Sequence, residues 1–142
     1  MLITQGENLR FEETLGISAL LGQVEHQLSQ KIEQSIRHFG ITLPQYSTLS
    51  AIEANQNLTN ADLARKCFVA PQTMNRILQN LLKMNLVKKN KNIFSLTAKA
   101  EKLVCDAHII VNTIEVQMIK SLNKKEFTEF QKTLDGFIRN LE

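Results

Sequence analysis

Apolar residues recur at three- and four-residue steps in the middle of the chain. This spacing lines one face of an α-helix and predicts a helix over residues 70–84. Pro71 stands in its first turn, where a helix accepts proline because the amide there would have no partner anyway. The opposite face of the first turns carries hydrogen-bonding side chains. The apolar face consists of Met74, Ile77, Leu78, Leu81 and Leu82, and the polar face of Gln72, Thr73, Asn75 and Arg76.

A shorter helix is expected before this one and a pair of short strands after it. Thr59 or Asn60 can cap the free amides at the start of the shorter helix. Residues 86–89 and 93–96 each suit a strand, and residues 90–92 join them at a tip where asparagine tolerates left-handed backbone. Two helices joined by a tight turn and followed by a two-stranded ribbon form a winged helix-turn-helix.

Long amphipathic helices are expected at both ends of the chain. The first apolar stripe starts at Leu15 and ends near Gly40, and Thr42 caps the next helix. After the hairpin, Thr97 caps a long helix, and Asn123 separates it from a final helix. The sequence therefore predicts a single, mainly α domain over residues 1–142. Its parts are a winged-helix lobe over residues 42–96 and a helical dimerisation region over residues 15–40 and 97–142.

The apolar stripes of these end helices are too long for the small central module to cover. We expect them to form the interface of a homodimer, although they could instead fold back on one another inside a monomer. A twofold dimer would place two copies of the helix over residues 70–84 on one face of a DNA duplex. The two helices would lie about one helical turn apart and match a pseudo-palindromic site.

Charge is concentrated in the same central part of the chain. Between Ala61 and Lys102 there are nine basic and two acidic residues, a net charge of +7, whereas the whole chain carries +3. A basic centre between acidic ends is the pattern expected of one phosphate-binding module. An ordinary helical hairpin with a solvated polar face remains the alternative for the periodicity by itself.

Several other classes of protein are not indicated. The sequence shows no catalytic triad, no paired-carboxylate motif and no glycine-rich phosphate loop, so we expect neither an enzyme nor a bound cofactor. His26, His38 and His108 are spread over different elements, and two cysteines provide no metal-ligand cluster. No apolar run approaches the roughly 20 residues needed to cross a bilayer, and no secretory signal is evident. We therefore expect a cytoplasmic protein.

The chain from about Leu15 onwards resembles the MarR family of transcriptional regulators. The most specific matches are residues 42–46, 58–64 and 73–87, followed by Leu96-Thr97 leading into the long helix. The resemblance implies a homodimeric winged-helix protein that represses genes by occupying palindromic promoter DNA. It also implies that a small aromatic or phenolic ligand can release the DNA, whereas some members sense oxidation at cysteine instead.

The resemblance also implies roles for individual residues. The helix over residues 70–84 would read the major groove, the start of the preceding helix would offer amides and a hydroxyl to a phosphate, and the ribbon would clamp phosphates. The groove readers would be Pro71, Gln72, Thr73, Asn75 and Arg76, the helix-start residues Thr59 and Asn60, and the clamps Lys88, Lys89 and Lys91.

The sequence departs from the family at the tip of the ribbon. Family wings usually have a longer loop with an Asp-x-Arg element whose arginine enters the minor groove, whereas this tip is only Asn90-Lys91-Asn92. We therefore assign no minor-groove reading to it. The short wing leaves open an alternative function, in which the protein binds another regulator as an antagonist or adaptor.

Two further hypotheses concern small-molecule and redox sensing. His38, Phe39 and Tyr46 could line a ligand cavity where the first long helix meets the lobe, or Phe39 and Tyr46 could belong to the core. Cys67 follows Arg65 and Lys66, and neighbouring cations can lower the pKa of a thiol and make it reactive. A buried, inert cysteine is the alternative. Cys105 is expected to pack among the long helices.

Overall fold

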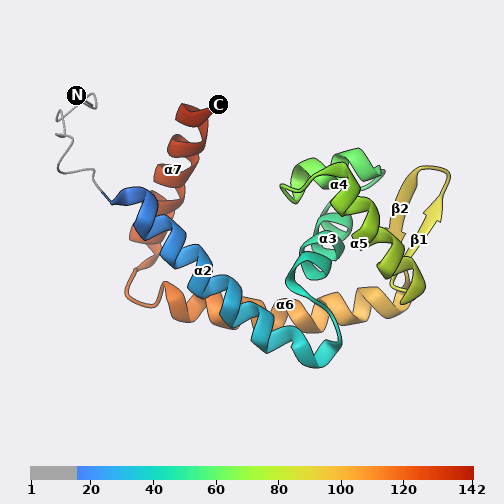
Figure 1. Cartoon of the computed structure of the whole chain (residues 1–142). Coiled ribbons are helices and arrows are strands. Elements are labelled where there is room, and N and C mark those ends of the chain that lie inside the picture. Colours follow the sequence, from blue (N-terminus) through green and yellow to red (C-terminus); the bar gives the residue numbers. More distant parts are fainter. Residues whose placement is uncertain (1–15) are drawn as a thin grey trace.

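The computed structural model describes residues 16–142 and has the mainly helical, winged-helix architecture that the sequence predicts (Figure 1). Leu15, where the first helix was expected to start, lies outside the described residues. The elements are α2 (Ile17–Ile36), the 3-10 helix η1 (Arg37–Phe39), α3 (Leu43–Ala54), α4 (Asn60–Lys66), α5 (Pro71–Lys83), β1 (Val87–Asn90), β2 (Ile93–Leu96), α6 (Ala98–Met118) and α7 (Lys124–Leu141).

Polar caps fix where the helices begin. The Thr42 hydroxyl accepts a hydrogen bond from the Gln45 amide, and the Gln45 side chain accepts one from the Thr42 amide. The Thr97 hydroxyl accepts from the amide of Ala100 at the start of α6. Asn123 caps α7 in the same way. Each cap satisfies amides that have no partner within the helix, so the chain starts helices at these residues.

The lobe has a core to which α3, α4, α5 and the hairpin contribute. Leu49, Leu63, Met74 and Leu78 are fully buried within it. The strands pair antiparallel with Val87 opposite Leu96, and the Phe94 amide donates to the carbonyl of Leu58 just before α4 (3.1 Å). The hairpin is therefore attached both to its own helix α5 and to the loop before α4.

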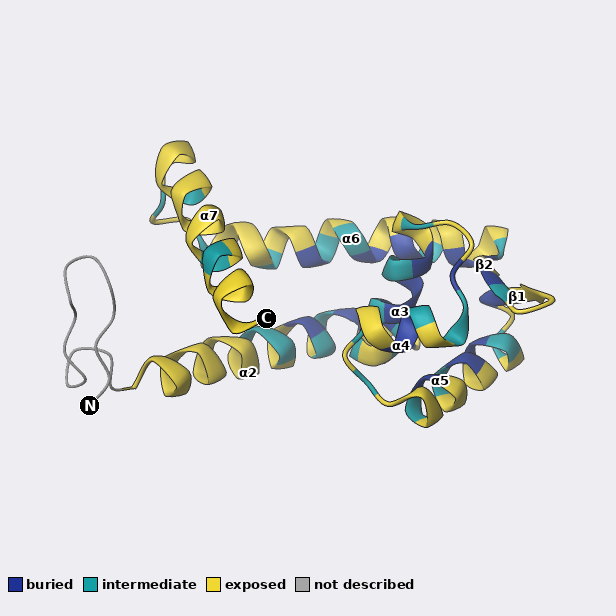
Figure 2. Cartoon of the chain, turned by 90° about the horizontal axis from the view of Figure 1, so that it is seen from above, coloured by how far each residue is buried: buried dark blue, intermediate teal, exposed yellow. Residues whose placement is uncertain are grey.

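The long helices α2 and α6 pack together along part of their length (Figure 1). Ile32 and Ile36 of α2 are buried, as are Val104, Ala107 and Val111 of α6. The first half of α2 is exposed in the single chain, and α7 is mostly exposed and has no buried residue, as Figure 2 shows. The apolar stripe of α7 is therefore not covered by folding back within one chain. The exposed large apolar side chains of these three helices are Ile17, Leu20, Leu21, Val24, Ile109, Val116, Met118, Phe130, Phe137, Ile138 and Leu141.

Candidate nucleic-acid interface

Helix α5 presents a polar face to solvent because its apolar face is anchored in the lobe. Met74, Leu78 and Leu81 are fully buried, while Ile77 and Leu82 are half-buried. The predicted inward stripe is therefore confirmed. Most of the remaining positions are exposed, and Figure 2 shows them along one side of the helix. Of the predicted groove readers, Pro71, Gln72, Asn75 and Arg76 are exposed and Thr73 is half-buried.

A surface hollow brings the beginnings of α4 and α5 together. It has a volume of about 440 Å³ and is lined by Asn60, Ala61, Pro71, Gln72 and Asn75. The Asn60 Oδ1 atom is buried and has no hydrogen-bond partner in the protein. The structure thus places Asn60 beside three of the predicted readers, which lie more than ten residues further along the chain. Three of the five lining residues carry side-chain amides, which can hydrogen-bond a ligand.

Thr59 is engaged in the cap of α4. Its hydroxyl accepts from the Asp62 amide (3.2 Å) and donates to Asp62 Oδ2 (2.9 Å). The Asp62 carboxylate also accepts from the Thr59 amide (3.0 Å) and pairs with Arg65 (2.6 Å). The hydroxyl and the amide of Thr59, which the sequence assigns to a phosphate, are therefore both bonded to Asp62 in this arrangement. Asp62, three residues after Thr59, completes a capping box at the start of α4.

Hydrogen bonds from the backbone and hydroxyl of Thr59 lower the pKa of the Asp62 carboxyl below its ordinary value of 3.8, and the nearby Arg65 and Lys66 act in the same direction. A lowered folded-state pKa gives stability that is present above pH 3.8 and is lost as the pH falls through the lowered value. We therefore expect Asp62→Asn to reduce the melting temperature at pH 7, with the difference from wild type shrinking below pH 3.8. Thermal unfolding at a series of pH values measures this, and a constant difference would contradict it.

The three wing lysines are exposed but do not share one environment. Lys88 lies opposite Ser95 in the ladder and lines a cleft beside α3, whereas Lys89 has its Nζ atom 5.6 Å from the centre of the Phe94 ring.

The turn between the two strands contains only two residues, and Lys91 in it has a positive φ of 57°. The expectation that an asparagine would take the left-handed conformation is wrong, because the register places Asn90 inside β1.

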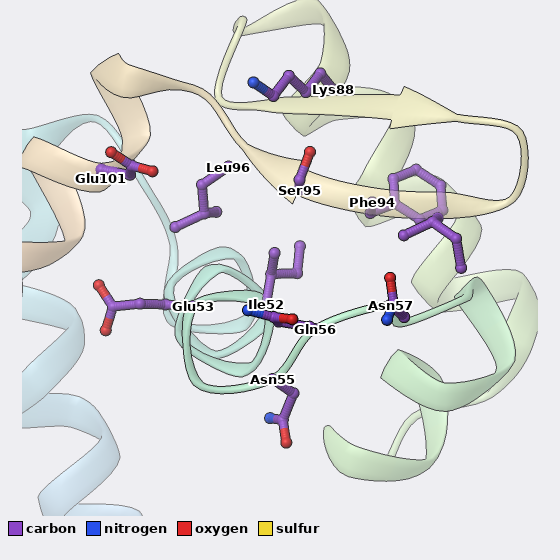
Figure 3. Close-up of a pocket in the computed structure, with 11 residues that line it drawn as sticks. Ile52, Glu53, Asn55, Gln56, Asn57, Lys88, Phe94, Ser95, Leu96 and Glu101 are labelled. Carbon is purple, nitrogen blue, oxygen red and sulfur yellow. The ribbon is translucent and has the colours of Figure 1, made fainter.

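The cleft beside the wing has a volume of about 640 Å³ and is bounded by α3, β2 and the start of α6 (Figure 3). Figure 3 shows Glu53 and Glu101 on one side of it, with Phe94 and Asn57 towards the other. Lys88 is the only basic residue among its lining residues. Two carboxylates against one ammonium make this cleft a poor site for an acidic ligand.

A smaller hollow lies between the long helices and has a different character. It has a volume of about 290 Å³, with apolar walls, two amide side chains and one ammonium group. Its lining residues are Val24, Gln27, Leu28, Lys31, Ile114, Gln117 and Met118. Apolar walls with a few polar groups are typical of small-molecule sites. Lys31 supplies the group in this hollow that would pair with an acidic ligand.

The predicted ligand residues His38, Phe39 and Tyr46 line neither of these hollows. His38 is exposed against the ring of the half-buried Phe39, with ring centres 4.0 Å apart. Tyr46 is buried, and its hydroxyl lies 2.6 Å from His108 Nδ1. Burial, followed by the negative charges of Glu115 and Glu53, raises the pKa of that hydroxyl.

Tyr46 belongs instead to a polar relay that links the lobe to α6. His108 Nε2 lies 2.8 Å from Glu53 Oε1, and because a carboxylate only accepts, this nitrogen carries a proton and donates it. One histidine of α6 thus contacts two side chains of α3, one with each ring nitrogen. Sequence analysis missed this relay because its members are 55 and 62 residues apart.

Removing the Tyr46 hydroxyl tests the strength of this link. Tyr46→Phe keeps the buried ring but leaves His108 Nδ1 without its partner, so we expect a loss of about 1 kcal/mol in the free energy of unfolding. Urea denaturation measures the change. In a His108→Ala background the same substitution should cost much less, and an equal cost in both backgrounds would show that the hydroxyl does not act through His108.

The two cysteines lie in different environments. Cys67 is half-buried at the end of α4, and burial raises the pKa of its thiol, so the neighbouring cations do not produce a reactive thiolate. Cys105 is exposed on α6 in the single chain, so the expectation that it packs among the long helices is not met there.

Residues 16–142 contain neither a cluster of metal ligands nor a membrane-spanning helix. In this part of the chain, no three His, Cys, Asp or Glu side chains are placed to hold a metal ion. Among the described helices, none has the length and apolar content needed to cross a membrane.

This chain is similar to known proteins over most of its length. A family model described as MarR family matches residues 39–92. The HTH-type transcriptional repressor Rv2887 of Mycobacterium tuberculosis is 27% identical over 123 residues, which cover 82% of this chain and 88% of the relative. The structure of Rv2887 in complex with DNA superposes with a TM-score of 0.74 and 26% identity, over 85% of this chain and 96% of that chain.

Two other solved structures are similar in the same way. Rv2887 in complex with p-aminosalicylic acid gives a TM-score of 0.72 at 25% identity, over 85% of this chain and 97% of that chain. The Staphylococcus aureus MepR–DNA complex gives a TM-score of 0.81 at 25% identity, over 94% of this chain and 100% of that chain. The similarity therefore includes both the lobe and the long helices.

Proposed function

Because the chain belongs to the MarR family, we propose that it is a DNA-binding transcriptional repressor that acts as a homodimer. In this proposal residues 42–96 form the DNA-binding lobe, and residues 15–40 and 97–142 form the dimerisation region. Helix α5 enters the major groove, with Gln72, Asn75 and Arg76 facing the base edges. The exposed polar face of α5, which shares a hollow with Asn60, is the observation that carries the proposal.

Electrostatics supports a nucleic acid as the partner of this face. The nine basic residues between Ala61 and Lys102 belong to the lobe and the first turns of α6. Arg76, Lys88, Lys89 and Lys91 are exposed and, apart from the ring beneath Lys89, their charged groups have no ion-pair or hydrogen-bond partner among residues 16–142. Exposed cations near a reading helix bind phosphates and release counterions, which makes binding depend on salt.

The exposed apolar side chains of α2, α6 and α7 support the homodimer. Eleven large apolar residues of these three helices are exposed in the single chain. Exposed apolar area of this extent marks a surface that is covered by another protein. A second copy is the fitting partner, since a twofold axis would bury the same faces of both chains and orient both α5 helices towards one duplex.

The hollow between α2 and α6 supports release of DNA by a small aromatic ligand. A relative has been crystallised with p-aminosalicylic acid, and Lys31 in this hollow provides a cation for such a carboxylate. The cleft beside the wing is less suitable because an acid would meet Glu53 and Glu101 there. A ligand between α2 and α6 would act on the helices that set the spacing of the two lobes.

The proposal assigns no catalytic step to the chain, and action on chromosomal DNA places it in the cytoplasm. The alternative of a protein-binding adaptor is not favoured. Its main support is the short wing. The reading helix, however, keeps an exposed polar face with Arg76, one relative is named an HTH-type transcriptional repressor, and two similar structures are complexes with DNA.

Binding to the DNA upstream of the protein's own gene tests the proposal. Fluorescence anisotropy at two salt concentrations, with an unlabelled random duplex as competitor, separates specific from general binding. We expect saturable binding by one dimer per site that survives the competitor. The proposed function would be contradicted by a protein that binds the upstream DNA no better than random DNA and that enriches no sequence when genomic fragments are selected for binding.

A further inference from the structure

Phe68 occupies an unusual place in the turn between α4 and α5. Its side chain is 94% exposed and its backbone has a positive φ of 58°. The Phe68 amide donates to the Arg65 carbonyl (3.3 Å) and the Val69 amide donates to the Ala64 carbonyl (3.0 Å). These two bonds form the Schellman motif that ends a helix, in which the residue at the position of Phe68 is left-handed and usually glycine.

The same motif recurs within this chain and provides a direct comparison. At the end of α5, the Asn85 amide donates to the Leu82 carbonyl and the Leu86 amide donates to the Leu81 carbonyl, both at 3.0 Å. Asn85 has a φ of 60° there, and asparagine tolerates this conformation well. A bulky aromatic residue does not, so Phe68 strains the backbone while its ring is left in water.

Within its own chain Phe68 therefore has little packing to offset the backbone strain, and we look for a partner outside the chain. A second copy of the chain does not fit, because the apolar side chains that a dimer would cover lie on α2, α6 and α7. The reading helix begins with Pro71 and Gln72, three and four residues after Phe68. Arg65 and Lys66, both exposed, lie just before the turn. Along the chain the ring thus neighbours the proposed reading helix and follows Lys66, whose ammonium suits a phosphate, whereas Arg65 is paired with Asp62.

We infer that Phe68 is an additional specificity-determining residue, whose ring packs against the methyl group of a thymine at the major-groove edge of the binding site. The inference rests on the proposed function. Thymine is the base that offers an apolar group in the major groove, and phenylalanine is among the side chains that contact it. A residue that strains the turn but improves the fit to DNA would have opposite effects on stability and on binding.

Phe68→Gly tests this combination in the full-length dimer. Glycine relieves the strain and removes the ring, so we expect the melting temperature to rise by about 2–4 °C. Affinity for the specific duplex should fall about fivefold for each half-site, because an apolar contact of this size is lost. A merely structural phenylalanine would instead show a lower melting temperature when it is replaced.

Replacing single thymines of the site with uracil identifies the contact. Wild type should lose about fivefold at one thymine in each half-site, whereas Phe68→Gly should bind the thymine and uracil duplexes equally. Asn85→Gly is the matched control, since it changes the same position of the same motif without removing a ring. We expect its affinity to equal that of wild type.

The outcomes separate this inference from the function on which it rests. If wild type shows no specific binding, the proposed function fails. If wild type binds specifically and Phe68→Gly binds equally well, the function stands and the inference is overturned in favour of a protein partner for the ring. If Phe68→Gly binds more weakly than wild type, but both proteins lose the same affinity at every thymine replaced by uracil, the assignment to thymine is overturned.

Discussion

Arg76→Ala is expected to abolish specific DNA binding while leaving the dimer folded. Arg76 is exposed in the second turn of α5, on the face opposite the buried Met74 and Leu78, so the lobe does not need it for packing. An arginine that pairs with a base edge contributes about 1–3 kcal/mol of discrimination, and a twofold dimer loses it in both half-sites. Anisotropy with the specific duplex should therefore show a loss of about 100-fold or more.

Arg37→Ala is the matched control for this loss, because Arg37 is an exposed arginine outside the lobe, in η1. It removes the same charge, so it should change affinity only through the general electrostatic term. Both variants should keep the melting temperature of wild type. If Arg76→Ala binds the specific duplex as tightly as Arg37→Ala does, then α5 is not the reading helix or Arg76 is not one of its readers.

The fold could be predicted from the sequence where local rules decide it. The three- and four-residue spacing of Met74, Leu78 and Leu81 identifies the buried face of α5 without any tertiary information. Thr42 and Thr97 cap helices because a hydroxyl at that position satisfies free amides whatever the rest of the chain does. These features depend on a few consecutive residues, and the structure agrees with each of them.

Features that depend on distant residues were not predicted. The contact of His108 with Tyr46 and Glu53 is a property of how α6 crosses α3, and no spacing within either helix indicates it. For Tyr46 the sequence leaves a ligand cavity and the core both open; the structure buries the ring, and the partner of its hydroxyl, His108, could not be foreseen. The left-handed conformation of Phe68 was also missed, because the usual signal for it is a glycine or an asparagine.

Ile138→Glu is expected to separate the dimer into monomers and to weaken DNA binding as a consequence. Ile138 belongs to the apolar stripe of α7 and is 57% exposed in the single chain, so a glutamate there would not disturb the core of the lobe. In a twofold interface it would bury two uncompensated carboxylates, which should weaken association at least about 100-fold. Light scattering after gel filtration measures the mass of the particle.

A monomer holds only one reading helix, so it also loses the gain that comes from binding two half-sites at once. That gain is about 10²–10⁴ in affinity for linked sites. Thr128→Glu is the matched control, since Thr128 is exposed on the polar side of the same helix and the change adds the same charge. It should remain dimeric and bind DNA as wild type does. If Ile138→Glu remains a dimer at micromolar concentration, this face of α7 is not the interface. If it is a monomer with unchanged affinity for DNA, one lobe is sufficient for binding the site.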